Sequence, residues 1–112
     1  MANDFKSATA PSLAIASGTY TTLYTAPGSK TSIILEVDIA NKHSADITAS
    51  VLISDSSGSN DAFIVKAAPV PIGGALKVVS GQKIVMETGD VLKAAASVAS
   101  AADAVVSILE DV

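Results

Sequence analysis

The sequence predicts an all-β protein, an antiparallel β-sandwich of about eight strands with jelly-roll or Greek-key connections. Apolar and polar residues alternate along many short runs, which is the pattern of strands with one buried face. The runs recur at regular spacing and are separated by clusters of Gly, Asn, Asp, Ser and Pro, as in tight turns. Evidence for helices is poor.

Eight runs are expected as strands, in the order 19–27, 31–41, 46–54, 62–70, 75–80, 83–88, 91–97 and 104–112. The segments between them, such as APGSK, NKHSAD, SDSSGSND, PIGG and ETGD, have turn composition. Runs 31–41 and 46–54 are expected to form a hairpin joined by NKHSAD, followed by a wide polar loop. Pro69 and Pro71 cannot donate to a strand ladder, so their segment is expected at a sheet edge or at a crossing between sheets.

Alternation also predicts which side chains are buried. In run 31–41 it places Glu36 and Asp38 on the wet face. The buried face of that run is expected to hold Thr31, Ile33, Leu35, Val37 and Ile39, and that of run 46–54 Ile47, Ala49, Val51 and Ile53.

The Ala-rich segment LKAAASVASAADAVVSIL admits two interpretations, because Ala has the highest helix propensity. Ser97, Val98, Ser100 and Val105 interrupt the Ala run, and the segment ends in the alternating AVVSILEDV. We therefore expect two strands with a turn at SAAD, and a helix over 92–102 is the rival interpretation.

The chain of 112 residues fits one domain. We expect the β-sandwich to span residues 13–112, preceded by an extended N-terminal arm over residues 1–12, which shows no alternation. Aromatic residues make up only 4% of the chain, so the core must consist of small aliphatic side chains.

Charge and composition exclude several classes of function. The net charge is −4 and the chain contains no Arg, which argues against a nucleic-acid partner. It contains no Cys, so thiol catalysis and thiolate metal sites are excluded. Neither a secretory signal nor a run of apolar residues long enough for a membrane span is visible, and we expect a soluble protein without membrane contact.

Two candidate metal sites are weak. His43 is the only histidine, and it lies in a polar turn without further imidazole or thiolate ligands, so we interpret it as a solvated residue. The loop 55–61 offers Asp55, Asn60 and Asp61 as oxygen ligands around Gly58. It lacks the ligand order of a calcium loop and the distal bidentate Glu, and a hairpin loop is the simpler interpretation.

Catalytic constellations are also lacking. Glu87 and Asp90 are close in sequence, but both are expected to be solvated in a turn, whereas a general acid needs a desolvated carboxyl group. No Ser has a His base with an acidic partner, and PIGG does not open a helix as a phosphate loop would. We expect no catalytic residue, no metal and no cofactor. A carbohydrate-binding module would need some of the four aromatic residues, Phe5, Tyr20, Tyr24 and Phe63, to be exposed.

An ordered set of segments resembles small structural proteins of the virions of tailed bacteriophages, of the type found in phages of marine bacteria and cyanobacteria. The segments are LYTAPGSKTSIILEVDIAN, VLISDSSGSNDAFIVKAAPVPIGGALKV, GQKIVMETGDVLKA and VVSILED, and the resemblance spans about residues 20–112. It implies a β-sandwich component of the virion without naming its location on the particle.

From these observations we expect a capsid decoration, or cement, subunit on the outer surface of the phage head, made in the host cytoplasm. Its partners would be other virion proteins, with the major capsid protein favoured. The alternatives are a tail or baseplate adaptor and, from another class, a small carbohydrate-binding module. A homo-oligomer, with a trimer as the working number, is expected because Ile34, Leu52 and Val106 would be apolar on outward faces.

Overall fold

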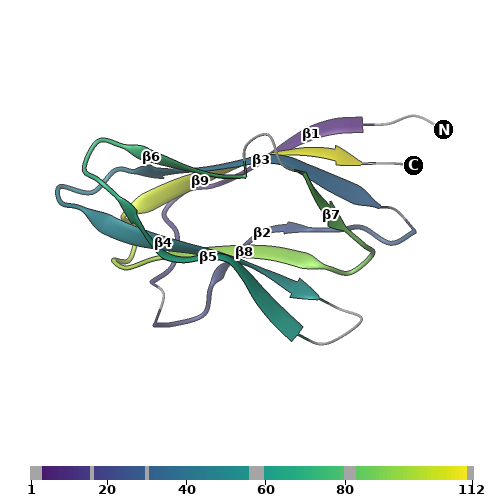
Figure 1. The fold of residues 1–112 in the computed structure, drawn as a ribbon, viewed down its shortest axis with the longest axis horizontal. Coiled ribbons are helices and arrows are strands. Elements are labelled where there is room, and N and C mark those ends of the chain that lie inside the picture. The colour runs from purple at the N-terminus through teal and green to yellow at the C-terminus, as the bar shows by residue number, and fades with distance from the viewer. Residues whose placement is uncertain (1–3, 16, 30, 56–59, 80–82, 111–112) are drawn as a thin grey trace.

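A computed structural model describes residues 4–15, 17–29, 31–55, 60–79 and 83–110, and these form two antiparallel sheets packed face to face (Figure 1). The strands are β1 Asp4–Ala10, β2 Thr21–Thr25, β3 Ser32–Asn41, β4 Ile47–Asp55, β5 Asn60–Val70, β6 Ala75–Val79, β7 Ile84–Met86, β8 Val91–Ala96 and β9 Ala102–Glu110. The predicted all-β sandwich is confirmed, and each of the eight expected runs contains a strand.

The order of the strands is that of a jelly roll. The first sheet has the order β1-β9-β3-β6, with the short β7 also pairing with β3, and the second has the order β2-β8-β4-β5. The chain therefore passes repeatedly from one sheet to the other, as in two interleaved Greek keys. The expected hairpin of runs 31–41 and 46–54 is wrong, because β3 and β4 lie in different sheets.

The N-terminal segment expected as an arm is, in its described part, the edge strand β1. It runs antiparallel to β9 in continuous register from the pair Asp4 and Glu110 to the pair Ala10 and Ala104. The sequence of β1 shows no clear alternation because a charged residue, Lys6, occupies an inward position, opposite Ile108. Its side chain lies at the end of the sheet and stays half exposed.

A β-bulge in β3 changes which of its side chains are buried. The register with β9 shifts between Ile34 and Glu36, so the inward face is Ser32 and Ile34 before the shift and Val37, Ile39 and Asn41 after it. The predicted inward positions of Thr31, Ile33 and Leu35 are wrong, because an extra residue at a bulge moves the preceding side chains to the opposite face.

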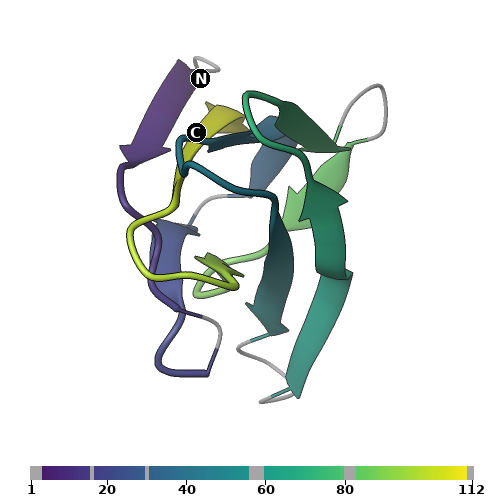
Figure 2. The same cartoon turned by 90° about the vertical axis from the view of Figure 1, so that its left-hand side faces the viewer.

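Strand β5 is an edge strand, as the positions of Pro69 and Pro71 predicted. Pro69 pairs with Thr48 at the edge of the second sheet, and the chain then crosses to β6 in the first sheet. Two register shifts bend β5 (Figure 2). At one of them Ala67 has a φ of 53°, and its N–H donates to Oγ of the buried Ser50 at 2.8 Å.

The core contains small aliphatic side chains and no aromatic ring. Its largest fully buried members are Leu13, Ile34, Ile39, Met86, Leu92 and Ile108. The predicted outward positions of Ile34 and Val106 are wrong, because both belong to the buried core, with exposed fractions of 0% and 1%. Leu52 has the predicted outward register position, opposite Lys93 and Phe63, but it is covered there and is only 6% exposed. None of the three therefore offers exposed apolar surface for an oligomer.

Candidate functional site

Four apolar side chains form a row across the outer face of the first sheet. The register pairs Phe5 of β1 with Leu109 of β9, Leu109 with Ile33 of β3, and Ile33 with Val85 of β7. Phe5 is 77% exposed and Val85 59%, and the two central residues are half-buried. Residues opposite one another in a sheet share a face, so these four residues, the outer apolar row, lie next to one another on the surface.

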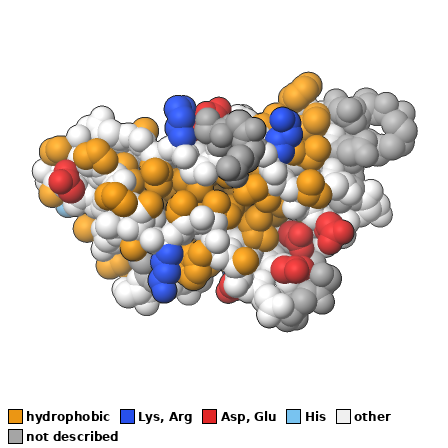
Figure 3. All heavy atoms as spheres, in the orientation of Figure 1, with side chains coloured by type: hydrophobic (Ala, Val, Ile, Leu, Met, Phe, Trp, Pro, Cys, Tyr) orange, Lys and Arg blue, Asp and Glu red, His pale blue; other side chains and the backbone are white. Residues whose placement is uncertain are grey.

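Polar residues border the outer apolar row. The next row along the strands holds Ser7, Ser107 and Glu36. Glu36 and Asp38 both pair with Lys77, at 3.2 and 3.5 Å. Hydrophobic side chains at the end of β1 lie at the top of the molecule in Figure 3. An apolar centre with a polar border is the usual composition of a protein interface.

Beneath this row, on the inner side of the sheet, lies a buried polar cluster. Oε2 of Glu110 accepts a hydrogen bond from the hydroxyl of Tyr24, which also lies 2.8 Å from Oγ of Ser32. Glu110 is 3% exposed, and its Oε1 is 3.0 Å from Nζ of Lys6. The cluster joins β2 of the second sheet to β1, β3 and β9 of the first.

The cluster changes the acidity of Tyr24. Burial, and the hydrogen bond that its hydroxyl donates to Glu110, raise the pKa of Tyr24 from 10.0 to about 12. Both effects disfavour the phenolate, the first through desolvation and the second through repulsion by a carboxylate. Tyr24 is thus held neutral as a donor, and the cluster has the character of a structural tie between the sheets.

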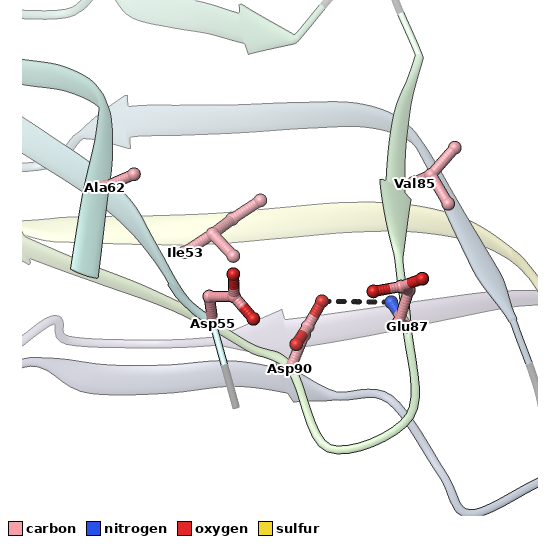
Figure 4. A pocket seen from close by; sticks show the side chains of 6 residues that line it. All are labelled: Ile53, Asp55, Ala62, Val85, Glu87 and Asp90. Carbon is pink, nitrogen blue, oxygen red and sulfur yellow. Dashed lines mark hydrogen bonds between the residues drawn. The ribbon is translucent and has the colours of Figure 1, made fainter. Parts of the chain in front are cut away.

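Three carboxyl groups border a hollow of about 470 Å³ at the side of the sandwich (Figure 4). Asp55 ends β4, and Glu87 and Asp90 flank the turn between β7 and β8. The prediction that both turn residues are solvated is wrong for Asp90, which is 7% exposed. Its Oδ2 accepts a hydrogen bond from the N–H of Glu87 at 3.0 Å, so this carboxylate closes the turn.

The acidic hollow does not bring its carboxylates together as metal ligands. Among the described residues, no group of three or more His, Asp or Glu side chains has the arrangement of a metal site. In the loop weighed as a calcium site, Asp55 and Asn60 pair as the last residue of β4 and the first residue of β5, whereas residues 56–59, with Gly58, lie outside the described part.

The remaining candidates have structural roles. His43 is half-buried in the connection between β3 and β4, and its N–H donates to Oδ1 of Asn41. Asn41 also donates to the carbonyl groups of Ala45 and Val70, at 3.0 Å each, which fixes this crossing between the sheets. In PIGG, the N–H of Gly74 donates to the carbonyl of Pro71 in a turn.

Two aromatic residues, Phe63 and Tyr20, lie next to each other outside the core. Phe63 is 45% exposed and contacts Tyr20 edge to face, with 6.4 Å between the ring centroids. Nζ of Lys66 lies 5.2 Å from the Phe63 centroid, so a cation covers a face of that ring. Two rings inclined by 66° do not form the flat platform on which a sugar ring stacks.

Comparisons with known proteins add little to this geometry. No protein-family model and no curated protein matches the sequence. Two solved structures are similar: a crystal structure of the IBDV viral particle, with 12% identity and a TM-score of 0.42, and a structure of infectious bursal disease virus Gt strain, with 11% and 0.33. Each comparison covers 96% of this chain, which spans only 30% and 32% of the length of those chains.

The sequence alone did not indicate the outer apolar row or the buried cluster. The row depends on the pairing of four strands that are far apart in the chain, and the cluster on Glu110 lying near the end of an inward-facing series. The signal that was present is the alternation in AVVSILE, which places Glu110 on the same face as Val106 and Ile108. Because Val106 was expected to face outward, this signal did not identify Glu110 as buried.

Proposed function

We propose that the protein is a structural subunit of a bacteriophage virion that acts through protein–protein contacts. The observation that carries the proposal is the outer apolar row, with Phe5 77% and Val85 59% exposed on one sheet face. Water contact with such side chains is unfavourable, and a bordered apolar patch is typical of a binding surface. The ordered segments that resemble phage virion proteins support other virion proteins as the partners.

Within this proposal, the protein decorates the outer surface of the head and binds the major capsid protein. A domain with a net charge of −4 and no Arg is suited to a position away from packaged DNA, because it would be repelled by a polyanion. It needs no catalytic group, metal or cofactor for this role. Jelly rolls occur in capsid and in lectin domains alike, so the fold does not distinguish these roles.

Binding to particles tests the outer apolar row. Purified protein is added to particles that lack it, and bound copies are counted against concentration. Phe5→Ser and Val85→Ser each remove exposed apolar area from the row and are expected to weaken binding about tenfold or more. Because both side chains are exposed, the fold should tolerate the changes.

Two matched substitutions elsewhere serve as controls. Phe63→Ser removes an exposed ring from the second sheet, and Ile72→Ser removes a side chain that is 57% exposed. Both variants are expected to bind like the wild type. Weaker binding by these two variants, with unchanged binding of Phe5→Ser and Val85→Ser, would assign attachment to the surface around Phe63 and Ile72 instead of the outer apolar row.

A carbohydrate-binding module is the alternative of another class. A glycan array probed with and without calcium separates it from the virion role. Saturable glycan binding that is lost in Asp55→Asn or Asp61→Asn would overturn the proposal. The absence of such binding, together with attachment to particles, would support it.

A further inference from the structure

Strand β1 is attached to the sandwich with almost no buried side chain. Of its residues only Ala10 is buried, with an exposed fraction of 7%, and Ala8 is half-buried. Its attachment consists of pairing with β9 from Asp4 to Ala10 and of the ion pair between Lys6 and Glu110. Such a strand can leave its place with the loss of only one core side chain, Ala10, and of the packing of Ala8 against the core.

Strand β9, in contrast, requires a strand at this edge. Glu110 is 3% exposed, and the ammonium group 3.0 Å from it belongs to Lys6 of β1. Loss of β1 would remove this cation from a buried carboxylate, which is unfavourable. The edge of β9 therefore selects an extended segment with Lys opposite Ile108, the register position that Lys6 occupies.

A short strained link connects β1 to the core. Leu13 is fully buried, and its N–H donates to the carbonyl of Ala102 at 2.8 Å. Only Pro11 and Ser12 separate it from β1, and Ser12 has a φ of 57°, in the left-handed region that L-residues disfavour. Its N–H is held by Oδ1 of Asp103 at 2.8 Å. A short link under strain favours exchange of the segment that it carries.

We propose that β1 is exchanged between copies of this chain, so that residues Asp4–Ala10 of one copy pair with β9 of a second and place Lys6 beside the second copy's Glu110. In the exchanged form only the link from Ala10 to Leu13 joins the two copies, and it spans roughly 10 Å when extended, so the two copies must lie with these edges close together. Exchange keeps every contact of β1 and lets Ser12 leave the left-handed region. The proposal does not depend on a virion role.

Engineered cysteines test the exchange, because the chain contains no cysteine of its own. Ser7 and Ser107 are directly opposed on the outer face. The full-length single variants Ser7→Cys and Ser107→Cys, carrying different affinity tags, are unfolded, mixed, refolded together at high concentration and oxidised. Only exchange brings a β1 cysteine next to a β9 cysteine of another chain. A mixture of Ser107→Cys with Thr22→Cys, an exposed position on β2, measures disulfides from random collision.

Exchange predicts about tenfold or more disulfide-linked heterodimer from the opposed pair than from the collision control, because paired strands hold the thiols at high effective concentration. The double variant Ser7→Cys/Ser107→Cys should correspondingly yield covalent dimers or larger species. Heterodimer at the level of the collision control, with the double variant closing only within single chains at every concentration, would overturn the proposal.

Discussion

Nζ of Lys6 lies 3.0 Å from Oε1 of Glu110, and Glu110 is only 3% exposed. The cation comes from a strand whose other side chains contribute little burial, whereas the carboxylate lies beside Tyr24 and Ser32. This ion pair therefore connects the N-terminal strand β1 to the buried polar cluster that joins the two sheets. Both the stability of the sandwich and the position of β1 should depend on this ion pair.

Replacing Lys6 with Met should lower the free energy of unfolding by about 1–2 kcal/mol. Breaking a fully buried pair costs more, but Lys6 is half exposed and solvent screens part of the interaction. Urea unfolding followed by circular dichroism measures the change. Lys77→Met is the matched control, since Lys77 pairs with Glu36 and Asp38 on the exposed face and its loss should leave the stability nearly unchanged. Equal losses in both variants would show that the burial of Glu110 has no special effect.

The raised pKa of Tyr24 predicts how the free energy of unfolding changes at high pH. Its pKa in the folded protein, about 12, is above the ordinary 10.0, so the folded state holds the phenol proton more tightly than the unfolded state does. This contribution is fully present below about pH 10 and is lost as the pH rises through about 12. Unfolding free energies measured across this range should fall more steeply for the wild type than for Tyr24→Phe. Parallel profiles would contradict the role of Glu110 as the acceptor.

Ser50→Ala should destabilise the protein by about 1–3 kcal/mol, although it removes a single oxygen. Ser50 is 4% exposed and accepts the hydrogen bond of the Ala67 N–H at the bend of β5, and a buried donor left without an acceptor is costly. Denaturant unfolding measures the effect. Ser107→Ala on the outer face is the control and should stay within about 0.5 kcal/mol of the wild type.

Ser12→Gly should shift the balance between single and exchanged chains towards the monomer. Glycine adopts a positive φ without strain, so the substitution relieves the strain of the unexchanged form. Light scattering over a range of concentrations reports the monomer fraction. Ser29→Gly, at a φ of 62° in the connection between β2 and β3, relieves similar strain away from the link and should leave the balance unchanged. A shift of the same size in both variants would argue against a special role of Ser12.

The strands could be predicted because their pattern and turn residues agree locally. The Ala-rich segment shows why propensity was the weaker guide. Ala94, Ala95 and Ala96 are each 0% exposed in β8, between β2 and β4 in the interior of the second sheet. At such positions only small side chains fit between closely packed neighbours. These tertiary contacts outweigh the helix propensity of Ala.

The faces and the candidate site could not be predicted in the same way. The bulge in β3 turns Ile34 to the buried face and Ile33 to the outer face. A run of consecutive apolar residues does not show where such a bulge lies. Likewise, Phe5 and Val85 are eighty positions apart, and only the pairing of β1, β9, β3 and β7 brings them into one row. Properties that depend on register between distant strands are therefore absent from local sequence patterns.

Under the proposed virion role a phage encodes this chain, and the most direct test of that role is the copy number of the protein in purified particles of such a phage, measured by quantitative mass spectrometry. Attachment to the head surface predicts hundreds of copies per particle, because each repeated capsid position offers a site. A few rings' worth of copies, in multiples of three or six, would keep the virion role and move the protein to the tail. Absence from washed, intact particles would contradict the account.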